Sequence, residues 1–200
     1  MSKMIIHKFI KIKNIVPLHA LKFNPMKTTK PLFLQFFISS VSAWLTYLAH
    51  EFFHWLAYTF FEIKTSFELN TIKVQDHSEI IPDSKLLIIY GSGVLFTFSQ
   101  SLYCYLRLKK KESIWLTALL ISAFELRLLA AILNFISPSD EGKISLILGV
   151  NQYTFSFLLL GGMGWFIYKL INGKKHTTKE LTLIFLVVFI SIYVFSRIKI

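Results

Sequence analysis

The sequence contains a single cysteine, Cys104, and few charged residues for its length. One cysteine excludes an intrachain disulfide and any cluster of thiolate metal ligands. Charged residues make up 16% of the 200 residues, whereas hydrophobic residues make up 54%. A soluble domain of this size needs far more polar surface to cover its core. The composition therefore excludes an ordinary soluble globular protein.

The first thirty residues lack the continuous apolar stretch of a cleavable signal peptide. The residues that interrupt it are Lys8, Lys11, Lys13 and Pro17. The chain also has no internal repeats and no low-complexity linkers. We expect residues 1–30 to form a basic cytosolic arm, either resting on anionic lipid or simply solvated.

Long apolar runs fill the remainder of the chain, residues 31–200. A helix that crosses a bilayer needs about 20 mostly uncharged residues. Five runs are long enough: Leu32–Phe61, Leu86–Leu106, Ile114–Ile136, Ile144–Ile171 and Leu181–Ile198. Lipid offers no hydrogen-bond partners to a free backbone, so such runs form helices. The predicted fold is an all-α membrane protein with about five transmembrane helices.

The basic charge is distributed around these runs in a way that indicates topology. Lys and Arg exceed Asp and Glu by a net charge of +11, concentrated before Pro31, in residues 107–111 and around residues 169–179. The segment 62–85 is instead acidic. Short cytosolic loops carry an excess of Lys and Arg, so this pattern places the N-terminus inside and the acidic segment outside. We expect a multi-pass protein of a prokaryotic cell membrane, with the lipid bilayer as a partner and no nucleic acid.

One segment outside the apolar runs has the pattern of a β-strand or hairpin. Residues Thr65–Val74 are rich in β-branched and aromatic residues with partial alternation. A short strand-like segment is therefore expected after the first helix.

The first apolar run contains the motif His50-Glu51-x-x-His54. On a helix, the two histidines fall about 40° apart around the axis and roughly 6 Å apart along it, so both can reach one metal ion. Glu51 lies beside them, where it can take a proton from water that zinc has acidified. Ionisable residues inside a membrane span are costly and are usually functional. The motif predicts a zinc site with Glu51 as general base.

A catalytic zinc needs a third protein ligand. The available residues are His77, Glu79, Glu125, Asp140 and Glu141. The first and third apolar runs cross in the same direction, which brings Asp140 to the membrane face nearest the motif, with Glu141 as the adjacent alternative. Glu125 lies nearer the middle of its run and close to Arg127, which favours an ion pair. Asp140 is the preferred third ligand.

The segment from Pro138 to Gly142 is expected to break the helical pattern around that ligand. Pro138 disfavours helix in the residue before it, and Gly142 permits a turn with positive φ. Irregular backbone at membrane depth is tolerated where it lines a polar cavity. A metal site that includes Asp140 meets this condition.

These motifs resemble those of the site-2 protease family of intramembrane zinc metalloproteases, of which the chain would be a minimal member. The first core helix of that family carries the His-Glu-x-x-His motif, and the third carries an Asp ligand in an Asn/Pro/Asp-Gly-type segment. The second motif is matched loosely by Asn134, Pro138, Asp140 and Gly142, with Glu141 intervening. Gly91-Ser92-Gly93 stands where the family has a Gly-Pro-type helix start. The resemblance covers Leu32–Gly149, and the helices in 150–200 would be additions.

The resemblance implies a zinc metalloendopeptidase that cleaves membrane-embedded client proteins. It implies that His50, His54 and Asp140 bind zinc and that Glu51 activates water. We expect Asn134 either to help position the client or to polarise its carbonyl. The alternative is a non-catalytic membrane protein, such as a transporter, an assembly factor or a metal-binding scaffold. Glu51 discriminates between the two, because a scaffold gains little from a base beside its ligands.

Overall fold

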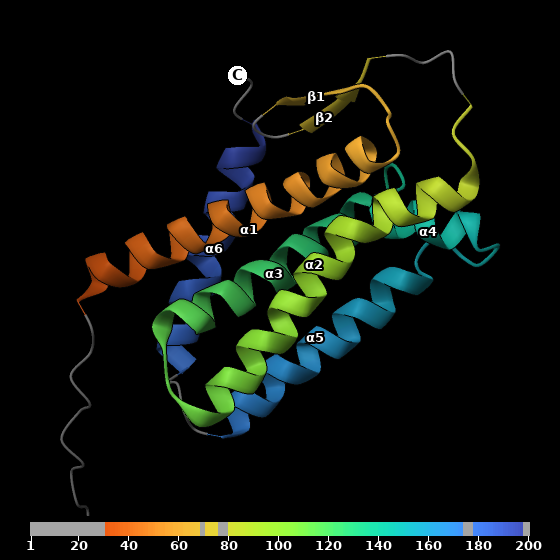
Figure 1. The fold of residues 1–200 in the computed structure, drawn as a ribbon. Coiled ribbons are helices and arrows are strands. Elements are labelled where there is room, and N and C mark those ends of the chain that lie inside the picture. The colour runs from red at the N-terminus through yellow and green to blue at the C-terminus, as the bar shows by residue number, and fades with distance from the viewer. Residues whose placement is uncertain (1–30, 69–70, 76–79, 174–177, 198–200) are drawn as a thin grey trace, which may run out of the picture. The chain divides into compact units, whose positions relative to one another are not determined.

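The computed structural model describes residues 31–68, 71–75, 80–173 and 178–197. These residues form six helices and one hairpin (Figure 1). In chain order the elements are α1 (Leu32–Phe60), β1 (Thr65–Glu68), β2 (Thr71–Val74), α2 (Asp83–Lys110), α3 (Ile114–Leu133), α4 (Asp140–Ile147), α5 (Thr154–Asn172) and α6 (Thr178–Arg197). The predicted N-terminal arm, His77 and Glu79 lie outside the described residues.

The ends of the helices follow local sequence signals. Pro31 and Pro82 occupy the N-cap positions of α1 and α2. Asp83 lies in the first turn of α2, and three basic residues lie in its last turn, which suits the direction of the helix dipole; they are Arg107, Lys109 and Lys110. The Ser113 hydroxyl caps α3 by accepting a hydrogen bond from the Leu116 amide.

Helix α3 lies at the centre of the bundle and contacts α1, α2, α5 and α6. One buried apolar cluster joins α1, α3 and α6 around Ile38, Ile121 and Ile184. A second joins α2, α3 and α5 around Leu108, Leu120 and Phe166. Helices α5 and α6 each complete one of these clusters, so they are integral to the packing of the helical unit.

Four helices, α1, α2, α3 and α5, are long and apolar enough to cross a membrane, as judged over the described residues. Large apolar side chains such as Phe33, Leu95 and Phe157 are more than half exposed on them. Contiguous apolar surface of this kind suits a lipid environment rather than water. The predicted all-α membrane fold is confirmed. The fifth predicted run is also helical, as α6, but it is not among those four.

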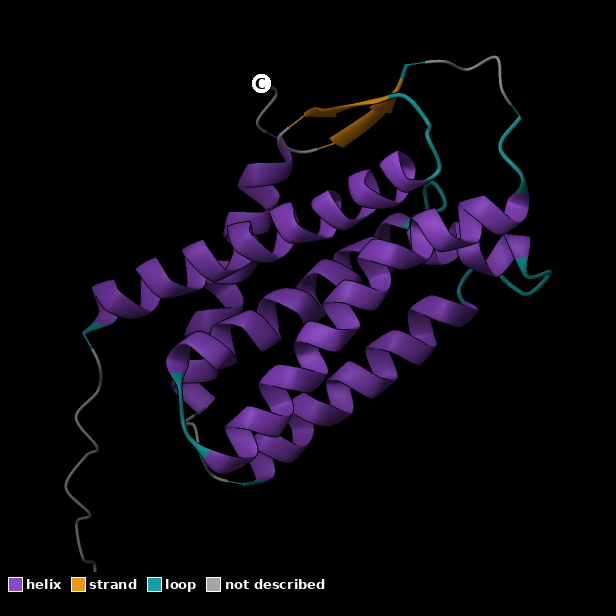
Figure 2. Ribbon diagram, viewed as in Figure 1, coloured by secondary structure: helices purple, strands orange, loops and turns teal. Residues whose placement is uncertain are grey.

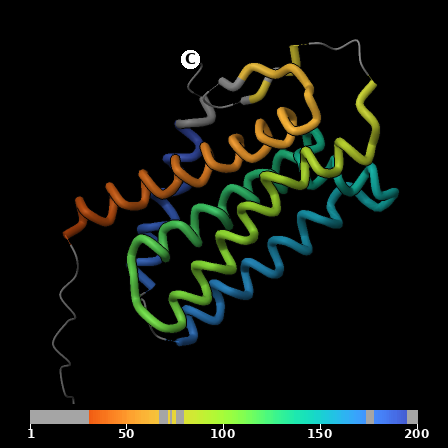
Figure 3. Tube along the Cα trace, viewed as in Figure 1, coloured from red at the N-terminus to blue at the C-terminus, as the bar shows by residue number. Residues whose placement is uncertain are grey.

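The predicted fourth span, Ile144–Ile171, is wrong as a single helix. The chain instead forms the short helix α4, breaks, and starts again as α5, and the Cα trace shows the loop between them (Figure 3). Gly149 has a φ of 70° in this loop, a conformation that glycine adopts without strain. Gly142, predicted to have positive φ, lies within α4 and does not have it. The third span also ends earlier than predicted, at Leu133 rather than Ile136.

The predicted strand-like segment is confirmed as an antiparallel hairpin. The pairing runs from Thr65 opposite Val74 to Glu68 opposite Thr71, so every residue of β1 has a partner in β2. The hairpin contacts α1 and lies alongside its C-terminal part (Figure 2). It therefore stands at the same end of α1 as the histidine motif.

Candidate metal centre

Helix α1 presents its histidines on a buried polar face. The buried polar residues of this helix recur every three or four positions, at Gln35, Ser39, Ser42, Thr46, His50 and His54. A helix in lipid gains nothing by turning apolar residues inward, and its polar groups are stabilised by facing other helices. His50 and His54 are 4% and 6% exposed and face the interior of the bundle.

Helix α4 supplies Asp140, and a hydrogen-bonded support fixes its first turn. The Ser139 amide donates to Asn134 Oδ1, and Asn134 Nδ2 donates to Ser156 Oγ at 2.8 Å. Gly142 has no side chain at the point where a Cβ would overlap Asn134 Oδ1. Asn134 is buried and engaged in these bonds, so it supports α4, and its role towards a client stays a prediction.

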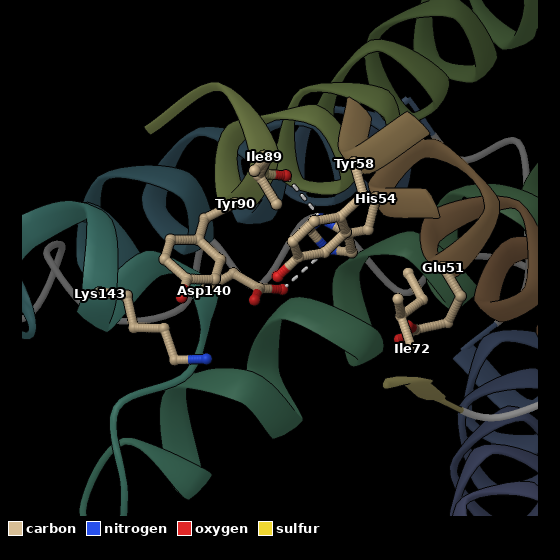
Figure 4. Close-up of a pocket in the computed structure, with 8 residues that line it drawn as sticks. All are labelled: Glu51, His54, Tyr58, Ile72, Ile89, Tyr90, Asp140 and Lys143. Carbon is tan, nitrogen blue, oxygen red and sulfur yellow. Dashed lines mark hydrogen bonds and ion pairs between the residues drawn. The ribbon is translucent and has the colours of Figure 1, made fainter. Parts of the chain in front are cut away.

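Three ligand atoms converge between α1 and α4. His50 Nε2 lies 3.1 Å from His54 Nε2, and Asp140 Oδ2 lies 3.3 Å from the first and 3.0 Å from the second. Figure 4 shows Asp140 directed at His54. The structure thus brings together the three residues that the sequence analysis assigned to the metal.

The hydrogen bonding of His54 leaves its Nε2 atom facing this point. His54 Nδ1 lies 2.7 Å from the carbonyl oxygen of Ile89, which can only accept, so Nδ1 carries a proton. In the neutral ring, Nε2 therefore presents a lone pair towards Asp140 Oδ2. Metal-binding histidines are commonly oriented by such a bond to a backbone carbonyl.

The neighbours of Asp140 favour its ionised form. Burial tends to raise the pKa of the Asp140 carboxyl, but the neighbouring His54 and His50 outweigh it and hold that pKa well below its usual value. An anionic oxygen then faces two ring nitrogens. A single proton can satisfy only one of the three contacts, whereas a bound cation satisfies all of them.

The donor set and spacing fit zinc. Tetrahedral zinc bonded at about 2.0–2.1 Å needs ligand atoms roughly 3.3–3.4 Å apart. The three observed separations, from 3.0 to 3.3 Å, are within a few tenths of an ångström of this value. Two imidazoles and one carboxylate are also a known ligand set for catalytic zinc.

No protein-family model, curated protein or solved structure matches this chain. What the centre can do is therefore argued from its own residues.

A pocket of about 230 Å³ opens beside the centre. Its lining residues are Glu51, His54, Tyr58, Ile72, Ile89, Tyr90, Asp140 and Lys143 (Figure 4). Glu51 is half-buried and shares the pocket with both His54 and Asp140. The predicted base and two of the predicted ligands thus line one space, large enough for water and part of a peptide.

Glu141, the alternative third ligand, is engaged elsewhere. Arg127 donates from its NH1 group to Glu141 Oε1 at 2.7 Å, and Ser139 Oγ donates to Oε2 at 2.9 Å. Both carboxylate oxygens are occupied, and Glu141 is fully buried. Asp140 is therefore the residue of this pair that faces the histidines.

The predicted pairing of Glu125 with Arg127 is wrong. Residues two apart on a helix point to different faces. The Arg127 side chain therefore pairs with Glu141 of α4, whereas the Glu125 side chain points elsewhere. Both carboxylate oxygens of Glu125 are buried and have no hydrogen-bond partner within the described part of the chain.

Sequence reasoning missed two contacts of the histidines. The NH2 group of Arg127 lies 3.3 Å from His50 Nδ1 and 3.2 Å from Nε2, so the guanidinium is close to both nitrogens of this ring. Gly93 of α2 packs against both imidazoles so closely that a Cβ there would overlap them. The glycines of Gly91-Ser92-Gly93 were the available signal, but sequence alone does not say what packs on them.

Proposed function

We propose that this protein is an intramembrane zinc metalloendopeptidase that hydrolyses peptide bonds in membrane-embedded clients. The observation that carries the proposal is the convergence of His50 Nε2, His54 Nε2 and Asp140 Oδ2 beside a pocket that Glu51 lines. Two imidazoles with a carboxylate bind zinc, and a neighbouring glutamate is the base that hydrolysis requires.

Each residue of the centre has a separate role in this proposal. His50, His54 and Asp140 would hold zinc, which would supply Lewis-acid chemistry at the scissile carbonyl and the attacking water. Glu51 accepts a proton from that water as its oxygen bonds to the carbonyl carbon. Glu51 then returns the proton to the amine nitrogen as the carbon–nitrogen bond breaks.

The client must reach the pocket in an extended form, because helical carbonyls are already hydrogen-bonded. Ile72 of β2 lines the pocket, so the hairpin borders the space where the client would lie. A hairpin edge can hold an extended chain by adding it as a further strand. This supports a client that unwinds beside β1 and β2.

The resemblance to the site-2 protease family is part of the proposal and gains support from the packing. Its loosely matched second motif contains residues that contact one another here: a Cβ on Gly142 would meet Asn134 and Pro138. This packing places Asp140 in the first turn of α4. The intervening Glu141 does not disturb Asp140, because its side chain pairs with Arg127.

The proposed topology is multi-pass, with the N-terminus in the cytosol of a prokaryotic cell. Ile72 ties the pocket to the segment 62–85, so the centre opens on whichever side that segment occupies. Reporter fusions after Lys111 and after Lys175 should read cytosolic, and a fusion within Asp76–Asp83 should read external. The reverse pattern would place the centre towards the cytosol, as is usual in the family.

Substitution of the base tests the proposed activity. Glu51→Gln should retain zinc and abolish cleavage of a co-expressed membrane client, because the amide cannot accept a proton at neutral pH. Glu62→Gln, at an exposed glutamate just beyond α1, is the matched control and should cleave normally. Cleavage at the unsubstituted rate by Glu51→Gln would contradict the mechanism. Zinc without proteolysis in the unsubstituted protein would favour a metal-binding scaffold.

A further inference from the structure

The pocket contains a cation that the proposed chemistry does not use. Lys143 lies three residues after Asp140 in α4, on the same side of the helix, and lines the pocket. Its Nζ atom lies 4.6 Å from the centroid of the Tyr90 ring. Lys143 is solvent-exposed, and this contact with an aromatic face keeps its ammonium group beside the pocket.

No carboxylate of the described residues forms an ion pair with Lys143. Asp140 lines the same pocket but directs its Oδ2 atom to the two histidines. Glu51, the other acidic residue of the lining, does not lie next to Lys143. Figure 4 shows Glu51 and Ile72 on one side of Asp140, and Lys143 and Tyr90 on the other. The ammonium charge is therefore available to a ligand that enters the pocket.

The rest of the lining defines what such a ligand is. Acidic, basic and tyrosine side chains make most of the exposed lining polar, and Ile72 and Ile89 add smaller apolar parts. A ligand that matches this mainly polar lining and its lysine is an extended peptide, whose backbone is polar, carrying one carboxylate. An unpaired cation beside aromatic surface binds a carboxylate by a charge-assisted hydrogen bond.

We propose that Lys143 and Tyr90 form a carboxylate-binding subsite for the client, adjacent to the bond that is cut. The inference rests on the proposed function, because it takes the pocket to be the place where the client binds. The carboxylate comes either from an acidic side chain within the client or from a free C-terminus. The subsite determines which segment of a client enters the centre and takes no part in proton transfer.

Peptide binding to the full chain in nanodiscs of neutral lipid tests this subsite. The Glu51→Gln background prevents turnover of the peptides during the measurement. Three apolar decapeptides are compared: one with a central Glu and an amidated C-terminus, one with Gln in its place and an amidated C-terminus, and the Gln peptide with a free C-terminal carboxylate. The Glu and free-carboxylate arms separate the two sources of the carboxylate.

The expected result is tighter binding of at least one carboxylate peptide than of the amidated Gln peptide. Adding Lys143→Gln should remove that preference, weakening the preferred peptide about fivefold, as for a partly exposed ion pair. The amidated Gln peptide should bind unchanged. Lys169→Gln is the matched control, because Lys169 also lies over an aromatic ring, that of Trp165, but outside the pocket.

Several results would overturn the subsite. These are equal binding of all three peptides, no binding of any, or a uniform loss with Lys143→Gln. A Lys143-dependent effect produced only by anionic lipid in the nanodiscs would assign the lysine to headgroups instead. Cleavage by the unsubstituted protein is measured separately. Cleavage without a preference for carboxylate peptides would contradict the proposed subsite but not the proposed protease. A Lys143-dependent preference without cleavage would contradict the proposed protease but not the carboxylate-binding subsite.

Discussion

Gly93 offers the sharpest test of the metal centre, because a methyl group added at this position would overlap two of the proposed ligands. A Cβ built on Gly93 would lie 2.5 Å from His54 Nε2, 2.5 Å from His50 Cε1 and nearer still to His50 Nδ1. These imidazoles are held by Ile89 and Arg127, so they cannot swing freely aside. We predict that Gly93→Ala displaces both histidines and disrupts zinc binding.

The magnitude follows from two opposing effects. Replacing a helical glycine with alanine normally stabilises a helix by about 0.5–1 kcal/mol, because less backbone entropy is lost. Overpacking a close-packed site costs about 1–3 kcal/mol, so Gly93→Ala should destabilise the protein overall. Zinc affinity should fall by about 100-fold or more, since even changes to groups behind metal ligands cost about 10–100-fold.

The assay is zinc stoichiometry and a competitive zinc titration on the purified protein, with unfolding in mixed micelles measured in parallel. Gly91→Ala is the matched control, because it lies two residues away in the same helix and a Cβ there meets nothing within 4 Å. It should keep zinc and gain slightly in stability. If Gly93→Ala bound zinc as tightly as Gly91→Ala, the ligand assignment of His50 and His54 would be refuted.

The remaining predictions concern three carboxylates. Asp140→Asn should give folded but zinc-depleted protein by metal analysis, and full zinc occupancy in it would move the third ligand elsewhere. Glu141→Gln should keep zinc yet lose about 3–5 kcal/mol of stability in micelle unfolding, because it leaves Arg127 as an unpaired buried charge. Glu125→Met should raise stability by about 1–3 kcal/mol, because it removes a buried carboxyl without a hydrogen-bond partner in the described chain. A loss of stability would instead show that this carboxyl has a partner.

The parts of the centre that the sequence predicted depend on local geometry or on the direction of the helices. His50, Glu51 and His54 follow from the helical repeat, because four residues make about one turn. Asp140 followed from counting membrane crossings, and the structure places it at the histidines. The hairpin followed from its β-branched composition.

The parts that the sequence did not predict depend on contacts between distant segments. A continuous apolar run hid the loop at Gly149, since hydropathy does not record a change of direction. Proximity in sequence suggested Glu125 as the partner of Arg127, but the helical repeat points the two side chains apart, and α4 brings Glu141 to the guanidinium. The closeness of Gly93 to the imidazoles exists only once α1 and α2 are packed.

The separation of the proposed ligands along the chain would give a bound ion a mechanical role. His54 and Asp140 are 86 residues apart, so zinc bound between them closes a long loop that includes α2 and α3. Closing such a loop in a free chain removes unfolded-state entropy worth on the order of 4–5 kcal/mol, and less where the unfolded chain keeps its helices in lipid. A protein with one cysteine has no disulfide within its chain to do this. Zinc bound at the proposed centre would serve as an internal cross-link, and chelation should then loosen α4 from α1 as well as stop the proposed chemistry.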